Sequence, residues 1–138
     1  MEVGPVATEF EQEDISTTLA KCQRYYYKLN SIGNNAYHYF GTGQNRSTTV
    51  TNTVVNAPVT MRTSPTMGTT GTAANYGVLH NGNTITACSS IPAIAGDTDG
   101  VLVHNITAAV SSGLTAGDAV FLLANNVASA YLDFDAEL

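Results

Sequence analysis

The segment Tyr76–Cys88, YGVLHNGNTITAC, carries the clearest fold signal in this chain. Two short runs rich in apolar and β-branched residues, Tyr76–His80 and Thr84–Cys88, flank the pair Asn81–Gly82. Asn and Gly tolerate positive φ, which a type I′ turn requires at both of its central positions. The segment therefore predicts an antiparallel β-hairpin.

Similar short runs recur on both sides of this hairpin at intervals of about 8–12 residues, which is typical of a β-sandwich or barrel. The first expected strand is Arg24–Leu29, and about eight follow it in a sandwich: Ala36–Phe40, Ser47–Val55, Val59–Thr63, Tyr76–His80, Thr84–Cys88, Gly100–Thr107, Ala119–Ala124 and Ala130–Phe134. Gly41–Thr42–Gly43 is expected to end the strand Ala36–Phe40.

One short helix is expected before the strands. Asp14 can cap it, because its carboxylate accepts hydrogen bonds from first-turn amides. Ile15, Leu19 and Cys22 follow at i, i+4 and i+7, so they form one apolar stripe over two turns. We predict residues 1–13 to be an extended lead-in and residues 14–138 to be a single all-β domain.

The few charges of this chain are unevenly placed. Its 138 residues include five basic and eleven acidic side chains, a net charge of −6. This balance argues against nucleic-acid binding, which needs Lys and Arg to neutralise phosphates. From Leu29 to Gly96 the only charges are Arg46 and Arg62. Two explanations stay open: much of this surface is buried against other subunits, or it is a Thr/Asn coat facing water.

Targeting signals and cysteine frameworks are not recognisable. No apolar run is long enough to predict a membrane span, and no basic start with an apolar run predicts a secretory signal. Cys22 and Cys88 are too few for a disulfide framework or a zinc site. We expect two buried free thiols, with a single disulfide as the alternative, and no cofactor.

Two groups of acidic residues are candidates for a chemical role. Asp97 and Asp99, followed by Gly100, resemble the start of a calcium loop, but the remaining ligand positions are missing and a plain turn is the preferred interpretation. Asp133, Asp135 and Glu137 alternate, so they share one strand face. A solvated outer face is preferred for them over a glycosidase pair.

The other groups also predict no catalytic site. Separate structural roles are expected for the histidines, His38, His80 and His104. No nucleophile elbow or phosphate-binding glycine loop is present, and the sequence predicts no enzyme. The densest aromatic set lies between Tyr25 and Phe40, where Tyr26 is the best candidate for an exposed ring.

Several stretches together resemble C-terminal domains of bacteriophage tail-fibre and related virion proteins. The most specific are Cys22–Tyr26, with the sequence Cys-Gln-Arg-Tyr-Tyr, and the ending Asp133–Leu138, with the sequence Asp-Phe-Asp-Ala-Glu-Leu. Val3–Glu11 and Val59–Thr66, the latter with a Met-Arg-x-x-Pro-Thr motif, add to the resemblance. It implies a jelly-roll-like antiparallel β-sandwich, a homo-oligomer that is expected to be a trimer, and a lead-in that follows an upstream domain. It supplies no catalytic residues.

The resulting hypothesis is a virion protein whose tip domain attaches the phage to a glycan or protein of the host surface, next to other virion proteins and without membrane insertion. The expected receptor contacts are Tyr76, Asn81 and Tyr26, with Asp97 and Asp99 as a weak metal candidate. One alternative is a capsid decoration or cement protein. The other is a surface-polysaccharide depolymerase that uses the face of Asp133, Asp135 and Glu137.

Overall fold

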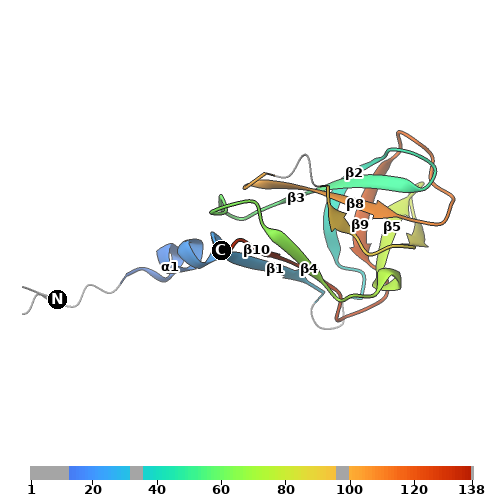
Figure 1. Ribbon diagram of the computed structural model, residues 1–138. Helices are drawn as coiled ribbons and strands as arrows, with labels where there is room; N and C mark the ends of the chain where they lie inside the picture. The colour runs from blue at the N-terminus through green and yellow to red at the C-terminus, as the bar shows by residue number, and fades with distance from the viewer. Residues whose placement is uncertain (1–12, 32–35, 96–99, 138) are drawn as a thin grey trace, which may run out of the picture.

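Ten strands and one α-helix make up the part of the chain that the computed structural model describes, residues 13–31, 36–95 and 100–137 (Figure 1). The helix α1 spans Ile15–Gln23, and a short 3-10 turn, η1, spans Ala73–Asn75. The strands are β1 (Tyr26–Asn30), β2 (Tyr39–Asn45), β3 (Val50–Asn56), β4 (Thr66–Thr69), β5 (Tyr76–His80), β6 (Thr84–Ala87), β7 (Ala93–Ile94), β8 (Val103–Ala109), β9 (Ala119–Ala124) and β10 (Tyr131–Asp135).

The strands form two antiparallel sheets, which confirms the predicted all-β sandwich. The smaller sheet has the order β1-β10-β4, and the larger has the order β6-β5-β9-β2-β3-β8-β7. The pairing is nested: the first strand pairs with the last, and β2 pairs with β9. β4 and β5 then flank β10 and β9 on their free sides. This nesting is that of a jelly roll, with β3, β8 and β7 extending the larger sheet.

The core lies between the two sheets and contains a stack of aromatic rings. The Phe134 ring of β10 lies 4.7 Å from the Tyr27 ring of β1 and 4.7 Å from the His104 ring of β8. Phe134 and His104 are completely buried. Because β8 belongs to the larger sheet, this stack joins the two layers.

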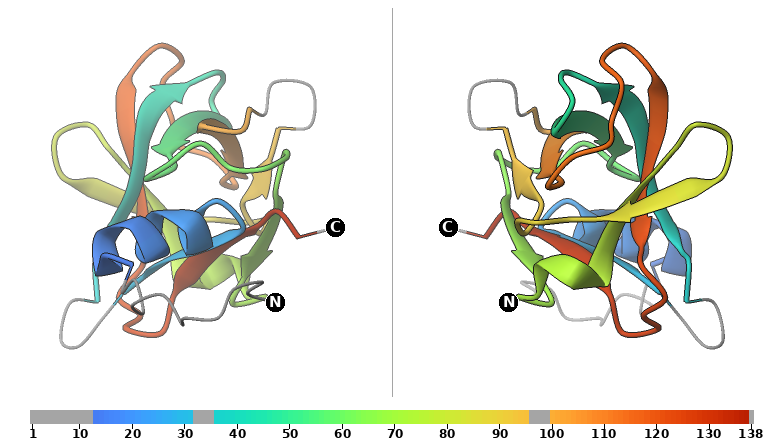
Figure 2. Two further views of the ribbon diagram at one scale, coloured as in Figure 1. Left: turned by 90° about the vertical axis from the view of Figure 1, so that its left-hand side faces the viewer. Right: turned by 90° about the vertical axis from the view of Figure 1, so that its right-hand side faces the viewer.

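The helix α1 begins as its sequence predicts. The Ser16 amide donates to Oδ2 of Asp14 over 3.1 Å. Hydrogen bonds from the Ser16 hydroxyl and then from its amide hold the pKa of Asp14 below its ordinary value. Yet none of the helix residues is buried, and α1 projects from one end of the sandwich (Figures 1 and 2). The described residues contain no helix long and apolar enough to span a membrane.

The hairpin that predicts the fold forms as expected, with one residue more in its loop. Asn81 and Gly82 have φ values of 48° and 79°. His80 pairs with Thr84, so Asn83 joins them in a three-residue connection.

The glycines of β2 lie within the strand and not at its end. Gly41–Thr42–Gly43 was expected to end a strand, but β2 runs through them to Asn45. A Cβ at Gly43 would lie 1.9 Å from the Asn52 carbonyl oxygen of β3. Glycine is needed here for the close approach of two strands and does not mark a turn.

The expected strand Val59–Thr63 is also wrong. Pro58 and Pro65 bracket it, and the segment is a loop whose Met61 is buried. The Met61 amide donates to the Val101 carbonyl oxygen over 2.6 Å, so the segment is held without a ladder. β4, which directly follows Pro65, and the two-residue strand β7 were not expected from the sequence.

Candidate functional site

The described residues contain no metal site at the acidic or histidine side chains considered from sequence. Asp97 and Asp99 lie outside the described residues. Within the described ranges, no three or more His, Cys, Asp or Glu side chains gather where they could hold a metal ion. His104 is part of the core stack, and the buried His80 lies 2.9 Å through Nε2 from the Thr86 hydroxyl.

Tyr76 is not available as a receptor contact, which corrects the expectation from sequence. Its side chain is 0% exposed. Its hydroxyl donates to the Tyr131 carbonyl oxygen over 2.6 Å and accepts from the Thr70 amide over 2.9 Å. The Thr70 hydroxyl also lies 3.1 Å from it. Since Tyr76 is on β5 and Tyr131 is on β10, the hydroxyl ties one sheet to the other.

The other two expected contacts are exposed but lie on different parts of the molecule. Asn81 is at the exposed tip of the β5–β6 hairpin. Tyr26 is 45% exposed on the outer face of the smaller sheet, where its hydroxyl donates to Asp133 over 3.3 Å. Partial desolvation and, after it, the Asp133 carboxylate raise the pKa of Tyr26. The structure thus brings none of the three expected contacts together.

The cysteines are both free thiols, as expected, but only one is buried. Cys88 is buried beside β5, and burial raises the pKa of its thiol to about 12. Cys22 is exposed on α1, which corrects the expected burial.

The acidic side chains near the C-terminus lie on the outside, as the preferred interpretation has it. Asp133 and Asp135 share the outer face of β10, and Glu137 follows on the surface. Asp133 extends over Gly68 of β4, where a Cβ would lie 2.0 Å from its Oδ1. The Lys28 ammonium group lies 3.7 Å from the centre of the neighbouring Tyr131 ring. This face is a network of surface polar contacts and not a cleft with two opposed carboxyl groups.

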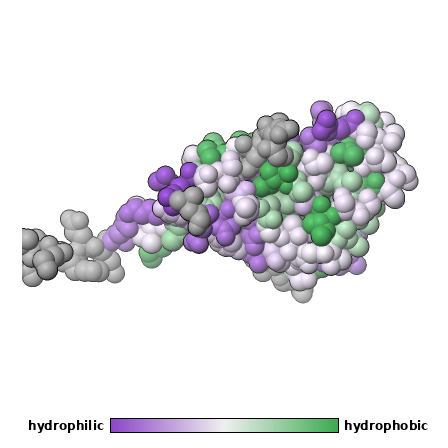
Figure 3. Space-filling model, viewed as in Figure 1, coloured by the Kyte–Doolittle hydropathy of each residue, from purple (hydrophilic) through white to green (hydrophobic). Residues whose placement is uncertain are grey.

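The larger sheet provides a different surface. Its seven strands contain no Asp, Glu, Lys or Arg. In Figure 3, hydrophilic residues gather over α1 and the adjoining end and form a smaller cluster at the upper right, while most of the remaining sandwich surface is pale or green. Five of these strands, β2, β3, β5, β6 and β7, lie within the charge gap seen in the sequence.

One row of cross-strand partners spans six strands of the outer face of this sheet. Pairs in direct register connect, in order, Ile85, Leu79, Phe121, Thr42, Val54 and Asn105. Ile85, Phe121 and Val54 are 37–42% exposed. A contiguous patch of exposed apolar side chains commonly marks an interaction site.

An aromatic pair stands at the centre of this row. Tyr39 is 55% exposed, and its ring meets Phe121 edge to face at a centroid distance of 5.3 Å and an angle of 73°. A polar row runs alongside, in which Gln44 pairs with Asn52 and Asn52 with Thr107. The Thr107 hydroxyl donates to Oδ1 of Asn52 over 3.2 Å. We call the aromatic pair, the apolar row and this polar row the platform.

The platform offers rings for stacking and uncharged amides and hydroxyls for hydrogen bonds. It has no acid, base or nucleophile arranged for a reaction, so its chemistry is that of binding. Sequence reasoning missed it because Phe121 lies in the unbroken apolar run Ala119–Ala124, where no alternation shows which side chains face outward. For Tyr39, the sequence indicates only membership of an aromatic cluster and not whether the ring faces the core or the solvent.

Comparisons with known proteins find no match to a family model, to a curated protein or to a solved structure.

Proposed function

We propose that this chain is a virion domain of a bacteriophage appendage that attaches the particle to a glycan on the host surface, and that the platform is its binding face. The observation that carries the proposal is the Tyr39–Phe121 pair, exposed on a sheet without charged residues. The resemblance of Cys22–Tyr26 and Asp133–Leu138 to virion proteins supports the phage context.

The chemistry of the platform suits a neutral sugar. A pyranose ring has an apolar face of C–H groups that packs on an aromatic ring, and hydroxyls that exchange hydrogen bonds with amides. Tyr39 and Phe121 supply the rings, while Gln44 and Asn52 supply amides on the neighbouring row. An uncharged face does not repel acidic surface polysaccharides and does not select for them either.

The hairpin tip extends this face. Asn81 comes two residues after Leu79, a member of the apolar row, and is exposed at the hairpin tip, so we expect it to contact a longer glycan at the edge of the platform. Tyr26 is on the other sheet and belongs to a separate surface. A single open platform binds weakly, so several copies on one particle would attach by avidity.

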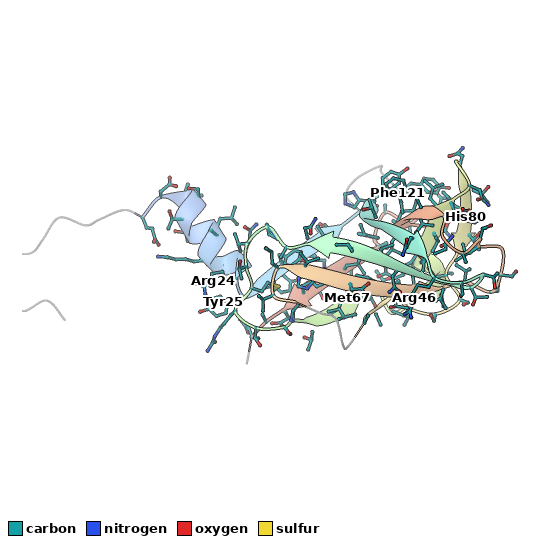
Figure 4. All side chains as sticks on the ribbon, turned by 90° about the horizontal axis from the view of Figure 1, so that it is seen from above. Arg24, Tyr25, Arg46, Met67, His80 and Phe121 are labelled. Atoms are coloured by element: carbon teal, nitrogen blue, oxygen red, sulfur yellow. The ribbon has the colours of Figure 1, made fainter. Side chains whose placement is uncertain are left out.

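The test is a glycan array followed by titration of the best ligand against single variants. Tyr39→Ala and Phe121→Ala are each expected to weaken binding at least about tenfold, which corresponds to about 1.4 kcal/mol. Tyr25→Ala is the matched control, because this tyrosine is 42% exposed at the base of α1, far from Phe121 (Figure 4). Its affinity is expected to stay within about twofold of the unmodified chain.

Two results would contradict the proposal. One is the absence of binding to any glycan or to host cells. The other is a bound glycan whose affinity does not change in either platform variant. Loss of binding in Tyr26→Ala instead would move the binding face to the smaller sheet. Imaging of the particle with density for this chain on the head would favour the capsid decoration alternative.

A further inference from the structure

The helix α1 lacks the packing that normally stabilises a helix of its length. It has nine residues, none of them buried, and Ile15 and Leu19 are 83% and 54% exposed. Helices shorter than about 12–15 residues are marginal in water, and helical stability in proteins comes mainly from an apolar face packed on something else. In Figure 4 the helix stands beyond the sheets, with Arg24 and Tyr25 at its base. Its apolar face therefore requires a partner that a single chain does not supply within the described residues.

The spacing of this face matches a coiled-coil seam. Ile15, Leu19 and Cys22 occupy positions d, a and d of a heptad, and Cys22 is exposed. The residues on the two flanks of the seam, positions e and g, are uncharged: Ser16, Thr18 and Gln23. The charged residues around the helix all fall at positions b, c and f, on the outer side: Glu13, Asp14, Lys21 and Arg24.

This charge placement is compatible with an identical helix as the partner. When identical helices pack in parallel, each residue meets its own copy, so a charge on the seam or its flanks would meet a like charge. Here no charge lies there, and the ion pair between Lys21 and Glu13 is made within one chain. The helix therefore has the pattern that a parallel homomeric contact requires.

The sandwich extends the contact surface at the base of the helix. Leu19 and Gln23 also line an open hollow of about 440 Å³, whose other wall includes Tyr26, Leu29 and Pro58 together with the polar Lys28 and Asn56. The surface of α1 thus continues onto the sandwich through a wall of mixed polarity. Three side chains per helix are a small seam, and this hollow adds the area that a stable assembly needs.

We propose that α1 packs in parallel against α1 of identical chains, with Ile15, Leu19 and Cys22 facing the common axis and the hollows gathered at its base. The inference rests on the helix and not on the glycan proposal. It assigns the homo-oligomeric contact to this end of the molecule and leaves the platform, on the outer face of the larger sheet, free.

The first experiment is oxidative cross-linking of the unmodified full chain, read on a non-reducing gel. Parallel packing brings the Cys22 side chains of neighbouring copies within the 4.4–6.8 Å Cα separation that a disulfide spans. Cys88 stays silent, because it is buried and its thiol pKa is raised to about 12. Covalent dimers are expected, and in a trimer only two of the three chains can be linked. Cys22→Ser should abolish them and Cys88→Ala should leave them unchanged.

The second experiment measures self-association by sedimentation for a matched pair of charge variants. Leu19→Glu puts like charges on the seam, whereas Thr17→Glu adds the same charge at position f of the same helix. Leu19→Glu is expected to weaken association at least about tenfold and Thr17→Glu less than about twofold. Both side chains are exposed in the single chain, so the sandwich should keep its unfolding midpoint in each variant.

Equal association of the two variants would overturn the inference, as would a chain that oligomerises without Cys22 cross-links or stays monomeric at high concentration. Glycan binding by such a chain would still support the proposed function, so the two proposals fail separately.

Discussion

The hydroxyl of Tyr76 offers the sharpest test of how the two sheets are held together. Tyr76→Phe removes one oxygen and keeps the buried ring. That oxygen makes three contacts of 2.6–3.1 Å, with the Tyr131 carbonyl and with the amide and hydroxyl of Thr70. Each hydrogen bond contributes a net of about 1 kcal/mol. Thr70 and Tyr131 are only half-buried, so water recovers part of the loss. We expect the free energy of unfolding to fall by about 2 kcal/mol.

The assay is equilibrium unfolding in urea, followed by far-UV circular dichroism. With a slope of about 2 kcal/mol per molar, the midpoint should fall by about 1 M while the slope stays unchanged. Tyr26→Phe is the matched control, because its exposed hydroxyl makes one 3.3 Å contact, and it should cost less than about 0.5 kcal/mol. Equal midpoints for the two variants would refute the bridging role. Glycan affinity should not change in folded Tyr76→Phe, since a buried side chain does not touch the ligand; a loss of affinity would contradict the structural role assigned to Tyr76 in place of a receptor contact.

Three further predictions concern the core, the thiols and the helix cap. Phe134→Ala should lower the free energy of unfolding by about 3–5 kcal/mol in the same urea assay, because it empties the centre of the aromatic stack; a loss below about 1 kcal/mol would contradict that role. A thiol reagent at pH 8, added to the reduced chain diluted until it is monomeric, should modify Cys22 at once and Cys88 only after denaturation, since a pKa of about 12 leaves about one thiolate in ten thousand; two fast thiols in the folded chain would be the contrary result. The pKa of Asp14 is lowered in the folded chain, so its contribution is present above the unfolded pKa and is lost as pH falls through the folded one; the helical signal and the Ser16 amide shift should change below about pH 4, and Asp14→Ala should remove that step.

Local features of the chain were the most predictable. The Asp14 cap and the positive φ of Asn81 and Gly82 depend on residues next to them in sequence, and all are found as expected. The strands Tyr76–His80 and Ala119–Ala124 were predicted with the observed bounds. Each of these strands can be recognised from its own apolar residues and from the turn residues that flank it, without knowledge of the strands it pairs with.

The predictions that fail concern residues whose environment is set by a neighbour distant in sequence. Gly43 looks like a turn residue, but the Asn52 carbonyl oxygen leaves no space for a Cβ. Tyr76 looks like an exposed ring next to a loop, but the contacts of its hydroxyl with Thr70 and Tyr131 place it between the sheets. The platform was not predicted for the same reason, because the register that aligns Phe121 with Thr42 and Leu79 joins strands far apart in the chain.

The sequence by itself determined the class of the fold, the hairpin, the capped helix with its apolar stripe, and the scarcity of charge, because propensity, capping and composition are local or additive properties. Only the tertiary structure decided how these features are arranged in space and which of them face outward. Long-range strand pairing gathered the uncharged residues into one sheet and turned Tyr39 and Phe121 outward. Among the residues that the structure describes, it also left the stripe of α1 without a cover, since packing depends on which surfaces meet and not on which residues follow one another.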